Sequence, residues 1–483
     1  MPYRIPTNTV LPIEIADATT SVAGVMSAED KRRLDQIAPG DGAREIRVIY
    51  VRTSGNDVTG DGSLANPYRT VAYAVQQLTR YADQLYQIID CTGIGTEELP
   101  EPLNVPPIIS NSHVITDPSP VYAGFPSIAA LTIRAVPDTV ETIAPGYTVN
   151  ASATTGLAEV VVAGAGWTVD EHRGRKLFWN GAVLSTIYAN TSDTLFVCTD
   201  AAFIDDSQAL VIVEESAELR LSTGASTIGA TLQLAGTQCS VCLCGIKITR
   251  AAPTVGTNQA LVFAQIEDFL AYGCSFQGVD LNGSVATTPL FSGVWIYGPS
   301  PFDAFNVAGS GFTAVDTFWD GIDGQWSVQG AASPGVYCLT CVFDGCNDVG
   351  QGGSNTPAIG FELRQVLIRN GNSNGVAYYG GPQCVLFSVE INDCAGAGVA
   401  VFAPGRVNAY GVTGTGNGLY GLYVEFGGRV SVDDGTVVTG ASGDLKVGGL
   451  AVRTWANYRS AAPVRHQADF FDAATSDGSV VSG

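Results

Sequence analysis

Aromatic side chains and carboxylates are interleaved between residues 291 and 326, and this pattern is typical of carbohydrate contacts. The segment holds four candidate stacking residues and three candidate acids: Trp295, Tyr297, Trp319 and Trp326, with Asp316, Asp320 and Asp323. Sugars present C–H faces that pack on aromatic rings and hydroxyls that pair with carboxylates. We therefore expect a glycan to bind along this segment, with the three tryptophans as stacking platforms.

The same acids raise the question of cleavage. Glycoside hydrolysis uses two carboxyl groups, about 5–5.5 Å apart in retaining enzymes and about 6.5–9.5 Å apart in inverting ones. Such a pair can come from Asp316, Asp320 and Asp323, or from Asp344 and Glu362 in a neighbouring repeat. Three interpretations stay open. The aromatic residues form a core or subunit interface with the acids in solvated turns, or the segment binds glycan without cleavage, or a carboxylate pair cleaves it.

Other chemistries have less support. The chain contains only three scattered histidines, at positions 113, 172 and 466, which argues against a Ser–His or Cys–His nucleophile. No glycine-rich phosphate loop lies between a strand and a helix, which argues against nucleotide chemistry. Asn56, Asp57 and Asp61 form an oxygen-rich loop without the full ligand spacing of a calcium site, so turn chemistry explains them.

Eleven cysteines offer possible metal ligands, and six of them lie in two groups: Cys239, Cys242 and Cys244, then Cys338, Cys341 and Cys346. Zinc needs four ligands that converge, whereas strand residues three apart point to opposite faces. Only Cys242 and Cys244 share a face by this rule. We therefore expect no metal site and no cofactor, and we interpret the cysteines as small apolar interior residues with free thiols.

Composition excludes several partners. The chain has 483 residues and 57 glycines, and its 46 acidic and 24 basic residues give a formal net charge of −22. This charge repels phosphate backbones and anionic bilayers, so we expect neither nucleic acid binding nor membrane insertion. No run of about 18 apolar residues is present to span a bilayer. Residues 1–25 show no signal-peptide pattern, so we expect the chain to fold in a reducing cytosol or to leave it without the usual secretion route.

A 23-residue repeat near the C-terminal end predicts the fold. Phe343, Val366, Val389 and Val412 recur at this interval, as do Val376, Val399, Leu422 and Leu445. A fixed period of this size marks stacked repeats, and apolar residues two apart indicate strands with one buried face. The prediction is an all-β protein built on a right-handed parallel β-helix (solenoid). We expect the first four residues to stack in one interior ladder.

The remaining sequence suggests five regions. An N-terminal arm with a short attachment helix covers 1–44, and the start of the β-helix covers 45–144, with a capping helix from about Thr70 to Gln87. An inserted β-rich subdomain with a basic run at 172–176 covers 145–235, parallel coils cover 236–466, and a flexible tail covers 467–483. The attachment helix begins near Ser27 and ends at Pro39, which makes it too short to persist alone.

Two stretches resemble bacteriophage tail spike and tail fibre proteins. Residues 24–35 (GVMSAEDKRRLD) are similar to a short helical segment of phage fibre chains. Residues 50–71, with Tyr50–Asp57, Gly60-Asp61-Gly62 and Asn66-Pro67-Tyr68, look like the start of pectate-lyase-like β-helix domains. The resemblance implies a homotrimer, attachment to the virion and binding of host surface glycan. The chain departs from the family in showing no long C-terminal trimerisation module and no family catalytic motif.

Taken together, these patterns favour a virion structural protein, a tail spike or fibre that contacts host-surface glycan during adsorption. Residues 1–39 would attach it to other tail or baseplate proteins. Two alternatives stay open: a β-helix polysaccharide depolymerase, hydrolase or lyase, and a purely architectural head or baseplate decoration protein.

Overall fold

The computed structural model describes residues 45–81, 85–110, 112, 115–116, 127–179, 183–222, 231–234, 238–251, 261–262, 268–277, 279–282, 289–298, 305–308, 312–321, 335–346, 348–349, 360–379, 383–402, 405–424, 429–432 and 436–447. The expected arm and attachment helix of 1–44 and the expected tail of 467–483 lie outside these residues, as do Trp326 and Asp323.

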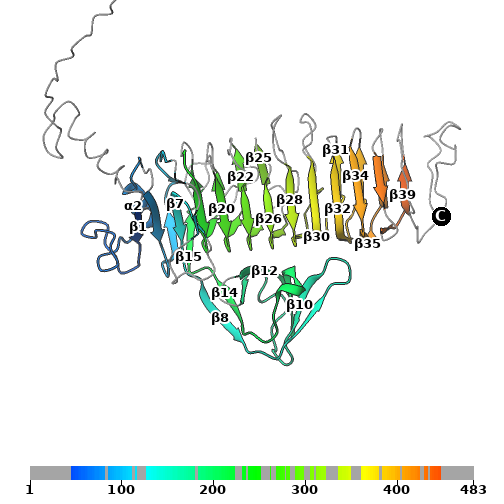
Figure 1. Cartoon of the computed structure of the whole chain (residues 1–483), viewed down its shortest axis with the longest axis horizontal. Coiled ribbons are helices and arrows are strands. Elements are labelled where there is room, and N and C mark those ends of the chain that lie inside the picture. The colour runs from blue at the N-terminus through cyan, green and yellow to red at the C-terminus, as the bar shows by residue number, and fades with distance from the viewer. Residues whose placement is uncertain are drawn as a thin grey trace, which may run out of the picture.

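The protein is a parallel β-helix, as the repeat predicted (Figure 1). A typical coil contributes one strand to a first ladder, then one to a second and one to a third, and strands within each ladder pair in parallel. The first ladder contains β1 (Glu45–Tyr50), β2 (Leu85–Asp90), β7 (Leu131–Arg134), β17 (Val241–Cys244), β20 (Phe269–Tyr272), β23 (Leu290–Ser292), β26 (Thr313–Val315), β28 (Val336–Leu339), β30 (Phe361–Arg369), β32 (Cys384–Asn392), β34 (Arg406–Tyr410) and β37 (Arg429–Val432).

The other two ladders complete each coil. The second contains β3 (Gly95–Leu99), β15 (Ala217–Leu221), β18 (Lys247–Arg250), β21 (Ser275–Gln277), β24 (Trp295–Tyr297), β27 (Phe318–Asp320), β29 (Val342–Asp344), the C-terminal halves of β30 and β32, β35 (Thr413–Asn417) and β38 (Val437–Gly440). The third contains β4 (Leu103–Asn104), β16 (Leu232–Gln233), β19 (Leu261–Val262), β22 (Val279–Asn282) and β25 (Phe305–Ala308), then β31 (Val376–Tyr379), β33 (Val399–Phe402), β36 (Tyr420–Val424) and β39 (Gly443–Val447).

The interior ladders confirm one predicted repeat and correct the other. Val376, Val399, Leu422 and Leu445 occupy successive paired positions, as expected. Val366 likewise pairs with Val389, but Phe343 pairs with Ile368, two residues beyond Val366, and so joins a different interior stack. All four residues of the Phe343 set face the interior. The difference arises because this coil has 25 residues between paired positions rather than 23, which displaces Phe343 by two residues along the strand.

Sharp corners separate the first ladder from the second. The corner residues have positive φ in successive coils: Gly245, Gly273, Gly293, Asp316, Thr340, Gln365, Ser388 and Gly411. In this left-handed conformation only glycine escapes the steric cost of a Cβ atom. The corners therefore explain part of the high glycine content.

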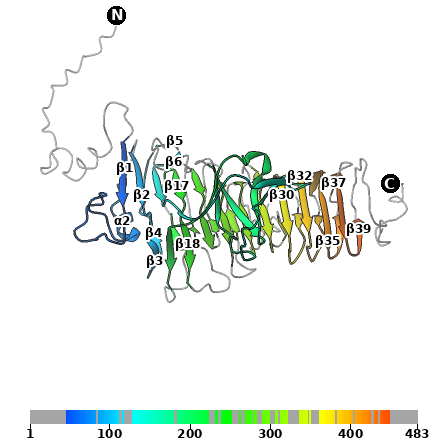
Figure 2. The ribbon, with the colours of Figure 1, turned by 90° about the horizontal axis from the view of Figure 1, so that it is seen from below.

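An antiparallel sheet is inserted at one such corner, between β7 and β15. Its strand order is β8 (Asp138–Ile143), β14 (Leu210–Glu214), β11 (Lys176–Trp179), β12 (Val183–Asn190), β13 (Thr194–Asp200), β10 (Leu157–Val161) and β9 (Thr148–Ala151). We call residues 138–214 the insertion. It has its own apolar core and lies along the side of the β-helix (Figures 1 and 2). It starts and ends earlier than the expected 145–235, because β15 pairs in parallel with β3 and belongs to the coils.

The expected helix from Thr70 to Gln87 was wrong in length. Thr70 caps α2 (Val71–Gln76), and its hydroxyl accepts a hydrogen bond from the backbone N–H of Tyr73. The chain then enters β2 at Leu85, which pairs with β1. The apolar positions near Leu85 fit a helical face on sequence alone, but pairing to β1 satisfies their backbone groups within the sheet. A small hairpin, β5 (Ile115–Thr116) with β6 (Ser127–Ile128), lies nearby in sequence.

Candidate binding cleft

The second ladder presents an outward row of side chains that the insertion covers only in part. From the β3 end the row runs Thr96, Glu218, Lys247, Ser275, Trp295, Phe318, Val342, Leu367, Glu390 and Thr413. These residues share a face because successive strand residues alternate between inside and outside. The insertion packs over part of this row, and the uncovered residues of the row form an open surface.

Contacts with the insertion begin at Ser275 and continue to the far end of the row. The Lys176 ammonium donates to the Ser275 hydroxyl at 3.1 Å. Val342 and Leu367 pack against insertion residues in one buried apolar cluster. At the far end, the hydroxyls of Thr154 and Thr413 are 2.9 Å apart. Thr96, Glu218 and Lys247 lie beyond this cover.

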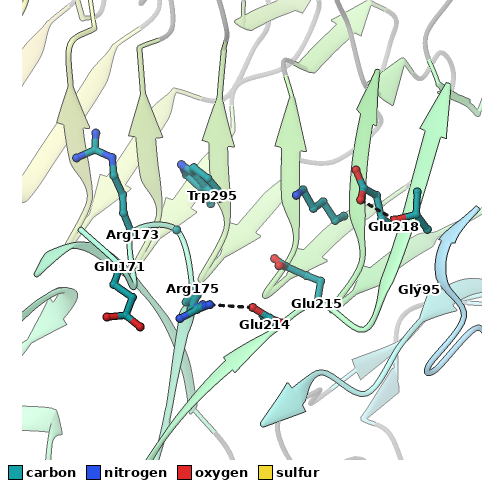
Figure 3. A pocket seen from close by; sticks show the side chains of 11 residues that line it. Gly95, Glu171, Arg173, Arg175, Glu214, Glu215, Glu218 and Trp295 are labelled. Carbon is teal, nitrogen blue, oxygen red and sulfur yellow. Dashed lines mark hydrogen bonds and ion pairs between the residues drawn. The ribbon is translucent and has the colours of Figure 1, made fainter. Parts of the chain in front are cut away.

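A cleft of about 420 Å³ opens where the cover stops (Figure 3). Its floor includes Thr96, Glu218 and Lys247, and its walls include Trp295 from the β-helix and the insertion's turn 171–175. Four glutamates line it, at positions 171, 214, 215 and 218, together with Arg173, Arg175 and Lys247. This mixture of charged groups around one aromatic residue suits a polar, hydroxyl-rich ligand.

Several of these charges already have partners. Glu214 pairs with Arg175 at 3.2 Å, and Glu215 pairs with the buried Lys176 at 3.4 Å. Burial lowers the pKa of Lys176, and the negative charge of Glu215 opposes that shift. Glu218 accepts hydrogen bonds from the hydroxyls of Thr96 at 3.0 Å and Thr249 at 2.6 Å. Among the described residues, Glu171, Glu218 and Lys247 form no ion pair, so they are the charged groups available to a ligand.

Trp295 lies at the boundary between the cleft and the covered row. Its indole stacks on Tyr297 with ring centroids 4.2 Å apart, and its Nε1 donates to Asp320 at 3.4 Å. Gly174 of the insertion lies directly against the ring, since an added Cβ would fall 2.3 Å from Cε3. Trp295 therefore lines the cleft with only part of its ring, rather than as the fully open platform that the sequence suggested.

Asp320, a catalytic candidate, instead fastens the insertion to the β-helix. Arg173 donates to both of its carboxylate oxygens, at 3.1 and 2.7 Å, and to Asp344 at 3.0 Å. Asp344 also accepts from Arg369 at 2.8 Å. Burial opposes ionisation of Asp344, but Arg369 and Arg173 hold its pKa below the usual value. We call these four residues the charged seam.

Asp316 lies at a corner beneath the insertion. Its carboxylate accepts a hydrogen bond from the Thr340 hydroxyl at 2.5 Å and one from Thr199 of β13. The residue keeps part of its accessible surface, yet burial of the carboxyl group raises its pKa to about 7, and the nearby Asp200 adds to this rise. Such a pKa suits a general acid, but the carboxyl group faces the insertion rather than the cleft, whose lining does not include Asp316.

Two further sequence expectations need correction. Trp319 is the inward residue of β27, only 1% exposed, and it stacks on Phe343 with centroids 5.5 Å apart. It therefore cannot serve as a glycan platform. Asp344 and Glu362 do not form a carboxylate pair, because Asp344 belongs to the charged seam on the second ladder whereas Glu362 pairs with Arg364 on the first.

Sequence reasoning missed most of the cleft. Arg175 belongs to the basic run 172–176 of the insertion and Glu171 precedes that run, whereas Glu218 and Lys247 belong to strands far from the aromatic segment. A weak signal existed in Glu218 and Lys247, which occupy outward positions of short alternating strands. Only their pairing in β15 and β18 makes them neighbours.

Metal chemistry finds no support among the described residues. All eleven cysteines are buried free thiols, and no cluster of three metal-ligating side chains occurs in the described ranges. Cys242 and Cys244 do share a face, with sulfur atoms 3.3 Å apart. In the loop near Gly60, Asn56 and Asp61 accept backbone N–H groups of residues two positions later, as turn residues do. The described part of the chain contains no helix long and apolar enough to cross a membrane.

Comparisons with known proteins add little. No protein-family model matches the chain, and no curated protein matches its sequence. One solved structure, described as the complex of XylC with xylose, is similar over 83% of this chain and 77% of its own, with 8% sequence identity and a TM-score of 0.24. A similarity this low carries no functional argument.

Proposed function

We propose that this protein is a virion structural protein, a tail spike or fibre that binds host-surface glycan in the cleft during adsorption. The cleft carries this proposal because it joins an aromatic side chain, hydroxyl groups and unpaired charged groups on a rigid scaffold. The resemblance of residues 24–35 and 50–71 to phage fibre and spike chains supports the virion assignment. In this proposal the protein is a homotrimer in the phage tail, attached through residues 1–39.

The glycan would lie against Trp295 and across the floor at Lys247 and Glu218. Sugar hydroxyls accept hydrogen bonds from ammonium groups and donate them to carboxylates. The C–H face of one sugar ring would contact the accessible part of the indole. Since the floor continues along the uncovered row toward Thr96, a chain of sugars would run along the β-helix axis.

A retention experiment on host cells tests this proposal. Wild-type protein and the variants Lys247→Met and Glu218→Gln would be incubated with host cells and with their purified surface polysaccharide. We expect both variants to lose retention by about tenfold, the effect of one good polar contact. Arg406→Met, an exposed substitution on β34 away from the cleft, is the matched control and should bind as wild type. Equal retention by all four proteins would contradict the proposal.

The depolymerase alternative is favoured by the glutamates of the cleft, because cleavage needs two carboxyl groups. The same incubations would be assayed for released reducing ends and unsaturated products. Release by wild type that disappears in Glu218→Gln would establish cleavage in this cleft. Retention without release of products would support a spike that only binds glycan. If the protein shows no retention and no release, the architectural role would be supported.

A further inference from the structure

Two of the polar contact sets that hold the insertion to the β-helix are built on aspartates. The charged seam pairs every carboxylate with an arginine. A second set of contacts lies around β13, where Asp316 and Asp200 approach each other. Asp200 accepts a hydrogen bond from the side-chain amide of Gln365 at 2.6 Å and caps the N–H of Ala202 at 2.9 Å.

No cation compensates this second set among the described residues. Around Asp316, the insertion contributes Asp200 and the hydroxyl of Thr199, and the β-helix contributes the hydroxyl of Thr340. The thiol of Cys198 interacts electrostatically with Asp316 and Cys341, and also with Lys176 and Arg369, which are paired with Glu215 and Asp344. Burial raises the pKa of Cys198 well above its usual value, so this thiol stays neutral. The surroundings of ionised Asp316 are therefore the carboxylate of Asp200, the hydroxyls of Thr199 and Thr340, and neutral sulfur.

Hydrogen bonds from Thr340 and Thr199 favour the ionised carboxylate, but burial and the nearby Asp200 outweigh them, so the docked insertion prefers protonated Asp316. An aspartate released from the interface has an ordinary pKa near 3.9, whereas docking raises the pKa to about 7. Because the docked form holds the proton more tightly, docking weakens as the pH rises between these two values and levels off above the higher one. Proton linkage sets the size of this effect at no more than about tenfold per pH unit.

We propose that the insertion is a pH-responsive clamp, which docks tightly while Asp316 carries a proton and loosens when Asp316 is ionised. One wall of the cleft, the turn 171–175, belongs to this insertion. The charged seam holds Arg173 of this turn directly, so loosening the clamp would change the cleft beside Trp295 only where the seam also yields. The consequence for ligand binding rests on the proposed function, whereas the clamp itself does not.

Hydrogen exchange without any glycan tests the clamp. Protection factors of the β13 amides, corrected for the intrinsic exchange rate, would be measured from pH 5 to pH 8.5 in wild type and in Asp316→Asn. We expect wild-type protection to fall by up to about tenfold per pH unit between pH 5 and pH 7 and then to level off, while the variant stays flat. Parallel profiles for the two proteins would overturn the proposal.

Two further variants keep the test decisive. Asp320→Asn weakens the charged seam and should lower protection at every pH while keeping the wild-type trend. Asp200→Asn removes the neighbouring negative charge and should move the wild-type transition to lower pH, and an unmoved transition would also overturn the clamp. Since none of these measurements uses glycan, a failed clamp leaves the proposed function standing, and failed glycan retention leaves the clamp standing.

Discussion

At the residue scale, one glycine decides how closely the insertion approaches the cleft's aromatic side chain. Gly174 has φ +82° and lies against the indole of Trp295, with no room for a Cβ atom. Gly164, in the same insertion, has φ +75° and open space where a Cβ would project. The two glycines share a conformational requirement but differ in packing.

We predict that Gly174→Ala destabilises the protein and reduces glycan retention, whereas Gly164→Ala affects stability alone. In both variants, alanine in the left-handed region lowers the free energy of unfolding by about 1–2 kcal/mol. Overpacking against Trp295 lowers it by about a further 1–3 kcal/mol in Gly174→Ala. Urea unfolding and retention on host cells would measure the two effects. Equal behaviour of the two variants would show that the contact with Trp295 is unimportant.

Trp319 illustrates the opposite outcome at the same scale, because a tryptophan expected at the surface is part of the core. We predict that Trp319→Ala costs about 3–5 kcal/mol through the cavity it leaves, while Trp319→Phe, which keeps most of the stack on Phe343, costs much less. Denaturant unfolding would measure both. Folded Trp319→Phe should retain glycan as wild type, and a specific loss of retention there would return Trp319 to the binding site.

At the element scale, the corners determine how each coil turns from the first ladder to the second. Four corner positions carry glycine, whereas Asp316, Thr340, Gln365 and Ser388 adopt positive φ with a side chain present. At Thr340 the hydrogen bond to Asp316 offsets part of this cost. Among the described residues Ser388, with φ +52°, makes no such hydrogen bond and is the better test site.

We predict that Ser388→Gly stabilises the β-helix by about 0.5–1 kcal/mol, because glycine relieves the left-handed strain. Ser431→Gly, the same change within the strand β37, should instead destabilise by a similar amount, since glycine gains backbone freedom in the unfolded chain. Thermal unfolding of the two variants would show shifts of opposite sign. Shifts of the same sign would contradict the corner argument.

At the scale of the whole molecule, the insertion contacts coils that are distant in sequence. Arg173 connects it to β27 and β29, and Thr154 reaches as far as β35. We predict that Arg173→Met loosens the insertion, because Asp320 loses its bidentate partner, and that protease cleavage within 138–214 accelerates several-fold. Arg364→Met, which removes an exposed pair with Glu362, is the matched control and should leave cleavage unchanged.

Assembly belongs to the same scale. The proposed spike is a trimer whose residues 1–39 order only with other copies or with a virion partner. Sedimentation of the isolated chain should therefore give a trimeric mass, and a clean monomer with an ordered N-terminal segment would contradict this proposal. Net charge −22 opposes association in general, so the trimer should become more stable as salt increases.

The sequence alone determined the repetitive part of the fold. The spacing of Val376, Val399, Leu422 and Leu445 predicted their register, because a stacked coil must place equivalent residues above one another. The alternation of apolar residues predicted an interior face. Both are local patterns, so they can be recognised without knowing the rest of the structure.

Only the tertiary structure decided which outward residues meet. A coil of 25 residues placed Phe343 two residues along the strand from its expected partner, and the alternation of β27 placed Trp319 in the interior. The insertion then covered most of the second ladder and left Thr96, Glu218 and Lys247 open. These three residues lie in separate coils, and Glu171 and Arg175 join them from the insertion. Their proximity follows from strand pairing and from the docking of a separate sheet, and neither leaves a periodic signal in the sequence.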